Sequence, residues 1–190
     1  MKTGFTFDSI APMQFELIRH LTGLLLTHTD RVPPHIGFCQ NGIYYSLSNI
    51  EQARPQNLQA VIRLIERKKI PSVFVQLDYP VFRPSTEIIE NILRLAPPII
   101  AGGSCLAPVK GIVEEFWGVQ VRHPLIHGLL DCLKEASIIQ KVWVTQFDNC
   151  LENGNSYTIP FYNEQAVKEH LRHFISGRAL PLPSLSQISY

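Results

Sequence analysis

The dipeptide Asn41-Gly42 constrains the fold more than any other feature of this 190-residue chain. Asparagine and glycine readily adopt the positive φ angles that a two-residue type I′ turn requires, and a short apolar run stands on each side of the pair. The sequence therefore predicts a β-hairpin over residues 33–48. The turn sets the register of this hairpin, whose facing pairs are Gln40 with Ile43, Phe38 with Tyr45, and His35 with Ser48.

Alternation along the two strands separates their side chains into two sets. The apolar set comprises Ile36, Phe38, Ile43, Tyr45 and Leu47. The polar set comprises His35, Cys39, Tyr44, Ser46 and Ser48. We interpret the apolar face as the one that packs on the core and the polar face as one that lines a cleft. The same alternation also fits any half-exposed hairpin.

The rest of the chain alternates between helical and extended patterns. Helices are predicted at Pro12–Thr27, Pro55–Lys69, Ser85–Leu95, Leu106–Trp117, Leu125–Leu133 and Glu164–Ser176. Extended segments are predicted at Ile70–Leu77, Lys141–Phe147 and Tyr157–Phe161, with a turn at Asn153–Asn155. The first of these strands is nearly all apolar and should be central. We expect an α+β fold, in which a small, mainly antiparallel sheet is flanked by helices, with one domain over residues 1–178 and an extended tail over 179–190.

Composition excludes several classes of protein. With 45% apolar and 17% charged residues, the composition is too hydrophobic for a disordered chain. A net charge of +1 with scattered basic residues argues against a nucleic-acid partner. No apolar run is long enough to predict a membrane span. Asp8-Ser9 stands where a signal peptide has its apolar core, so we expect a cytoplasmic location. The cysteines have no paired C-x-x-C spacing and are expected to be free thiols: Cys39, Cys105, Cys132 and Cys150.

Cys105 is the candidate nucleophile. Pro108 fits a helix only in its first turn, so a helix over Leu106–Trp117 places Cys105 at its N-terminus. A helix N-terminus stabilises a thiolate through its dipole and its free amides, and the same amides can hold an oxyanion. Gly102-Gly103, just before it, leaves room for a substrate.

His35 is the candidate base. It stands on the polar face of the hairpin, where its imidazole could take the thiol proton and later return it to a leaving group. A hydroxyl beside it, from Ser46 or Ser48, could fix the imidazole tautomer.

These elements stand in a recognisable order. A His-bearing strand at residues 34–38 is followed by a Tyr-Ser strand at 43–46, by a Val/Phe strand and helix at 73–95, and by Ser104-Cys105 at the start of a helix. This order resembles the circularly permuted branch of the NlpC-type, papain-like cysteine hydrolases, and residues 123–130 are similar to their downstream proline-then-helix segment. Leu106-Ala107-Pro108 departs from the small polar residue that members usually carry after the cysteine.

The resemblance implies a papain-like core with Cys105 as nucleophile and His35 as base. It also implies cleavage of an amide or ester bond, or acyl transfer, as in a thiol protease, with peptidoglycan peptides or lipids among the group's substrates. The partner on this hypothesis is a peptide-like or acyl substrate, and no cofactor or metal is expected.

Other interpretations remain open. Cys105 fits a small buried hydrophobe, and Cys39 shares the His35 face and could be the reactive thiol. His123 and His127 have the spacing of two ligands on a helix, but zinc would need further ligands beyond these and Cys132. The main alternative function is a non-catalytic adaptor or chaperone-like module that docks a protein partner through exposed apolar helix faces, above all Pro12–Leu26.

Overall fold

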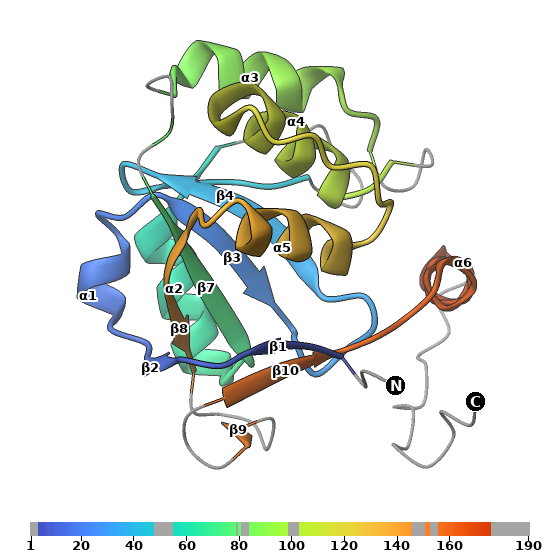
Figure 1. Ribbon diagram of the computed structural model, residues 1–190, viewed down its shortest axis with the longest axis horizontal. Helices are drawn as coiled ribbons and strands as arrows, with labels where there is room; N and C mark the ends of the chain where they lie inside the picture. The colour runs from blue at the N-terminus through green and yellow to red at the C-terminus, as the bar shows by residue number, and fades with distance from the viewer. Residues whose placement is uncertain are drawn as a thin grey trace.

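The computed structural model describes residues 4–47, 55–78, 80, 84–98, 103–145, 151–152 and 156–175 (Figure 1). The helices are α1 (Phe15–Ile18), α2 (Leu58–Lys68), α3 (Thr86–Leu95), α4 (Leu106–Trp117), α5 (Ile126–Glu135) and α6 (Glu164–Ile175). The larger sheet has the spatial order β2 (Ala11–Pro12), β8 (Ile139–Val144), β7 (Ser72–Leu77), β3 (Gly23–Thr27), β4 (His35–Gln40), β5 (Ile43–Tyr45) and β6 (Gln56–Asn57). A smaller sheet has the order β1 (Gly4–Phe7), β10 (Ser156–Pro160) and β9 (Leu151–Glu152).

The fold is α+β, as the sequence predicts, and its larger sheet is mixed. Neighbouring strands of this sheet pair antiparallel except β2 and β8, which are parallel. With seven strands among the described residues, the sheet is larger than the small one expected. The prediction that the Ile70–Leu77 strand is central is confirmed, because β7 lies between β8 and β3.

The hairpin has the predicted turn and register. Asn41 and Gly42 have φ angles of 50° and 75°, which is the left-handed region that a type I′ turn needs. Strands β4 and β5 pair in the expected register, with Gln40 opposite Ile43, Phe38 opposite Tyr45 and Cys39 opposite Tyr44. The predicted pairing of His35 with Ser48 lies outside the described residues.

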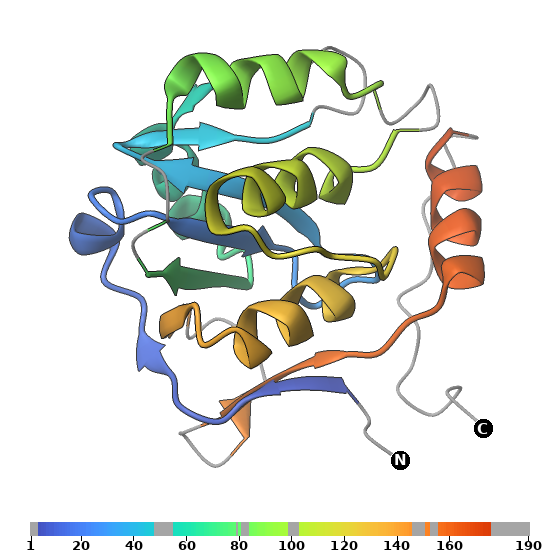
Figure 2. The same cartoon turned by 45° about the horizontal axis from the view of Figure 1, so that its top comes forward.

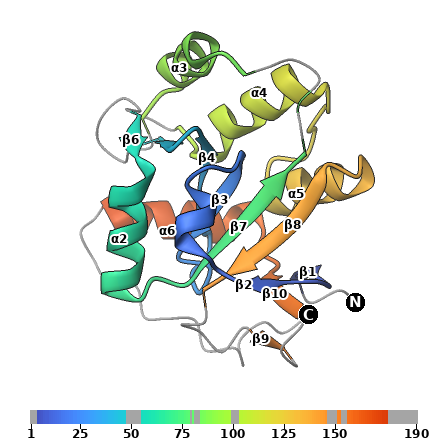
Figure 3. The ribbon, with the colours of Figure 1, turned by 90° about the vertical axis from the view of Figure 1, so that its left-hand side faces the viewer.

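Helices cover both faces of the larger sheet (Figures 1 and 3). Helices α3, α4 and α5 pack on the face that carries Ile36, Phe38 and Tyr45. Helices α1 and α2 pack on the other face, where Cys39 and Tyr44 belong to a second apolar cluster. The expectation that the polar face of the hairpin lines a cleft is therefore wrong at these two residues, because a free thiol and a phenol ring bury readily against apolar side chains.

The predicted helix over Pro12–Thr27 is also wrong. Helix α1 ends at Ile18, and β3 begins at Gly23. Strand β3 lies between β7 and β4 with both faces covered, so its three leucines, residues 24–26, are all fully buried. A strand buried on both faces has a continuous apolar run, which periodicity does not distinguish from a buried helix.

The remaining predicted helices are present, α4 with the predicted bounds and the others with ends that differ by at most three residues. Helix α2 begins at Leu58 rather than at the predicted Pro55, because Asn57 caps it: the Asn57 Oδ1 atom accepts the amides of Gln59 and Ala60 at 2.9 and 3.3 Å. The predicted turn at residues 153–155 and the tail at 179–190 lie outside the described residues. Within the described ranges, no helix combines the length and the apolar character that crossing a membrane requires.

Candidate functional site

Cys105 stands at the N-terminus of α4, as predicted. The turn before it depends on Gly103, whose amide donates to the Pro98 carbonyl at 3.0 Å, and a Cβ atom on Gly103 would lie 1.8 Å from the carbonyl oxygen of Pro97. The Ser104 hydroxyl accepts the Leu106 amide at 3.3 Å. Pro108 is the third residue of α4, where a missing N–H costs the helix no internal hydrogen bond.

Opposing effects act on the Cys105 thiol. Burial raises its pKa, whereas the backbone amides of Ile36, Leu106 and Cys105 itself lower it. Burial is the larger effect, so the net pKa lies above the ordinary value. The expectation that the helix N-terminus stabilises a thiolate is met only in part: the amides are in place, but at neutral pH the group is a thiol.

His35 is the first residue of β4 and pairs with Thr27 of β3. The Ile36 amide near the Cys105 sulfur places Cys105 close to the start of β4. Alternation, however, assigns His35 to the sheet face of Cys39, whereas Cys105 packs on the opposite face. Burial, with a smaller contribution from His28, lowers the pKa of His35 to about 4, so the imidazole is neutral near pH 7.

Ser46, the predicted orienting residue, is buried at 4% exposure. The Ser46 side chain lies near the Tyr44 phenol. Burial raises the pKa of Tyr44, and Ser46 lowers it to a smaller extent. The Tyr44 ring covers Gly37, since a Cβ atom there would lie 2.4 Å from the ring. The other candidate for this role, Ser48, lies outside the described residues.

The residues of the zinc hypothesis, His123, His127 and Cys132, have other contacts. His123 accepts the Leu125 amide at its Nδ1 atom at 3.2 Å, and Cys132 lies 3.8 Å from the Gln120 carbonyl oxygen. Among the described residues, no group of three or more His, Cys, Asp or Glu side chains is arranged to hold a metal ion. Cys39, Cys105 and Cys132 are free thiols, as predicted, and Cys150 lies outside the described residues.

Searches of family models, curated proteins and solved structures found no match. The relationship to permuted papain-like hydrolases therefore stays a prediction made from the residues.

Two site residues have no role in the sequence-based hypothesis of a Cys-His pair, namely His127 and Tyr162. The Tyr162 amide donates to the His127 Nε2 atom at 3.3 Å, and the two rings lie 4.6 Å apart between centroids. Tyr162 also lies near enough to Cys105 for a negative charge there to raise the pKa of Tyr162. Thirty-five residues separate Tyr162 from His127, so no local pattern could have joined them.

The site lies at the end of the molecule where two helices begin. Helices α4 and α5 run in the same direction, so that their N-termini are at the end near α6 (Figure 2). The first amides of these helices have no intrahelical acceptor, and they have local partners instead: the Leu106 amide donates to the Ser104 hydroxyl, and the Ile126 amide is close to the Tyr162 hydroxyl. The positive ends of two helix dipoles at this end of the molecule can stabilise an oxyanion beside a thiol.

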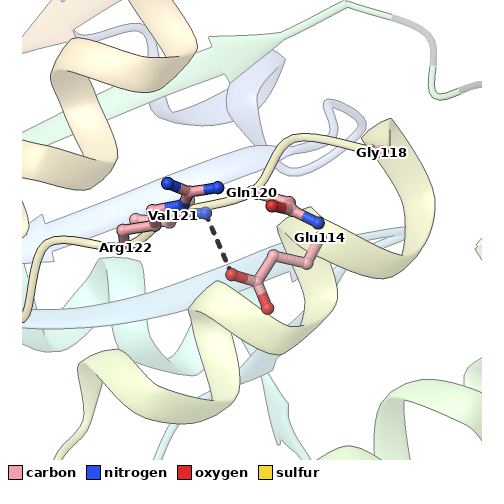
Figure 4. Close-up of a pocket in the computed structure, with 5 residues that line it drawn as sticks. All are labelled: Glu114, Gly118, Gln120, Val121 and Arg122. Atoms are coloured by element: carbon pink, nitrogen blue, oxygen red, sulfur yellow. Dashed lines mark hydrogen bonds between the residues drawn. The ribbon is translucent and has the colours of Figure 1, made fainter.

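A cavity of about 440 Å³ opens at the opposite end of α4 (Figure 4). It is lined by Glu114, Gly118, Gln120, Val121 and Arg122. One Glu114 carboxylate oxygen accepts the Val121 amide at 3.0 Å, and so ties the loop after α4 back to the helix. Because α4 is roughly 18 Å long, this cavity is separate from Cys105.

Proposed function

We propose that this protein is a cysteine-dependent hydrolase or acyltransferase that acts on an amide or ester bond, with Cys105 as nucleophile and His35 as base. The observation that supports this most is the cluster of amides around the partly buried Cys105 sulfur, from Cys105, Leu106 and Ile36. Such amides can also donate hydrogen bonds to a carbonyl oxygen and so stabilise the negative charge that develops on it during attack.

The protonation states suit general-base catalysis rather than a preformed ion pair. The sulfur is a thiol, because burial raises the pKa of Cys105, and the imidazole is neutral, because burial lowers the pKa of His35 to about 4. A neutral imidazole can take the thiol proton as the sulfur attacks the carbonyl carbon, and the resulting imidazolium can protonate the leaving group. Water or a second nucleophile then takes the acyl group from the thioester.

The proposed reaction requires that the His35 imidazole reach the Cys105 sulfur. Since alternation assigns His35 to the far face of the sheet, its imidazole has to reach Cys105 around the start of β4 rather than across a cleft. This requires only a local change at His35, because the Ile36 amide near the sulfur follows directly after His35 in the chain.

An activated ester tests the proposal. The protein is incubated with p-nitrophenyl acetate at pH 7.5, and the acetylated cysteine is identified by peptide mass spectrometry. We expect an acetyl thioester on Cys105 that is lost in Cys105→Ser and forms at least about tenfold more slowly in His35→Asn. Cys132→Ser, which removes a partly exposed thiol on α5, is the matched control and should acetylate like wild type. Equal labelling of Cys105 and Cys132 would refute the nucleophile, and an unchanged rate in His35→Asn would refute the base.

The adaptor alternative loses most of the segment on which it chiefly depended. Its docking helix was expected over Pro12–Leu26, but Leu24, Leu25 and Leu26 belong to β3 and are fully buried. These side chains cannot contact a partner while the sheet is intact.

A further inference from the structure

The segment after β10 crosses the start of α5 and is held there by His127. The Phe161 ring lies 4.5 Å from the His127 ring, edge to face, and the Tyr162 ring lies 4.6 Å from it. The Tyr162 amide donates to the His127 Nε2 atom at 3.3 Å. His127 thus fixes the main chain at Tyr162 through a hydrogen bond and two ring contacts.

His127 is a fixed acceptor. Its side chain is buried at 3% exposure, and its Nδ1 atom has no hydrogen-bond partner within the described residues. Because Nε2 accepts a hydrogen bond, the proton of the neutral ring is on Nδ1. Burial lowers the pKa of His127 to about 4, with Asp131 opposing the shift and His123 adding to it, so the ring still accepts the Tyr162 amide at neutral pH.

The Tyr162 side chain lies at the beginning of α5, against His127 and Ile126. Its hydroxyl is close to the Ile126 amide, and it lies near enough to Cys105 for a negative charge there to raise the pKa of Tyr162. Burial raises the pKa of Tyr162, so the hydroxyl keeps its proton and remains a hydrogen-bond donor. A neutral donor held beside a nucleophile is the arrangement that stabilises a developing oxyanion.

We propose that Tyr162 is a further residue of the Cys105 site, and that its hydroxyl donates a hydrogen bond to the acyl oxygen as Cys105 attacks. In this step the sulfur forms a bond to the carbonyl carbon, the carbonyl π electrons move to the oxygen, and the thiol proton passes to His35. The Tyr162 proton stays on its own oxygen. His127 acts through Tyr162 and is a positioning residue. This inference rests on the proposed function.

Two reactions of the same thiol test the role of Tyr162. Acetylation by p-nitrophenyl acetate builds an oxyanion, whereas alkylation by iodoacetamide displaces iodide and builds none. We expect Tyr162→Phe to slow acetylation of Cys105 by about tenfold to a hundredfold and to change its alkylation by less than about twofold. Tyr44→Phe is the matched control, because Tyr44 is also coupled to Cys105 but belongs to the other face of the sheet; it should keep the wild-type ratio of the two rates.

A second pair of variants tests His127. His127→Leu removes the acceptor of the Tyr162 amide and should lower the ratio of acetylation to alkylation, and His127→Gln, which keeps an acceptor, should restore part of it. If Tyr162→Phe slows both reactions equally, or neither, Tyr162 has no role in stabilising the oxyanion and the inference is wrong, although the proposed function stands. If wild-type Cys105 forms no acetyl thioester, the proposed function and this inference both fall.

Discussion

Acidification should destabilise this protein partly through His127. The pKa of this buried imidazole falls from its ordinary value of 6.5 to about 4 in the folded chain. Between these values the unfolded chain binds a proton that the folded chain does not. The stability associated with the neutral ring is therefore complete above pH 6.5 and is lost as the pH falls toward 4.

The size of this loss follows from the pKa difference. At about 1.4 kcal/mol for each pKa unit, a change from 6.5 to about 4 corresponds to roughly 3 kcal/mol. His127 as a residue is 3% exposed, and burial is the main cause of this effect. His35 adds a loss in the same pH range, because burial also lowers its pKa to about 4.

His127→Gln isolates the contribution of His127. Glutamine does not titrate, but its side-chain oxygen can still accept the Tyr162 amide. Urea unfolding of wild type and variant, followed by tryptophan fluorescence at pH 7 and pH 4.5, gives the free energy of unfolding at each pH. We expect the loss between the two pH values to be about 2–3 kcal/mol smaller in the variant. His20→Gln, which replaces an exposed imidazole, should show the wild-type loss.

An equal loss in wild type and His127→Gln would refute this reasoning. It would mean that the His127 ring is free to protonate in the folded protein, and that the Tyr162 amide is not held by a permanently neutral acceptor.

Other perturbations give equally definite outcomes. Asn57→Ala removes the cap of α2 and should lower the free energy of unfolding in urea by about 1 kcal/mol. Gly37→Ala brings a methyl group against the buried Tyr44 ring and should cost about 1–3 kcal/mol in the same assay, with no loss if the ring moves freely. Cys39 is fully buried with a raised pKa, so iodoacetamide should label it only after unfolding, whereas the partly exposed Cys132 should react in the folded protein; peptide mass spectrometry distinguishes the two.

Local chemistry was sufficient to predict the hairpin and the position of Cys105. Asn41-Gly42 sets its own turn, and the turn sets the register of β4 and β5 without help from the rest of the chain. Pro108 limits where α4 can begin, and so places Cys105 at its N-terminus. Each of these features depends on backbone angles and spacings within a few residues.

The remaining features depended on contacts between distant segments. The leucines of β3 form a strand because β7 and β4 pair with it on both sides, which no local period records. The pKa of Cys105 is raised because burial outweighs the amides around it, and burial is a property of the packed chain. The sequence by itself determined the turn of the hairpin, the register of β4 and β5, and the N-terminal end of α4, because these are set by backbone geometry over short distances. Only the tertiary structure decided that the polar face of the hairpin is covered and that Tyr162 joins His127, because desolvation and packing act between residues far apart in the chain.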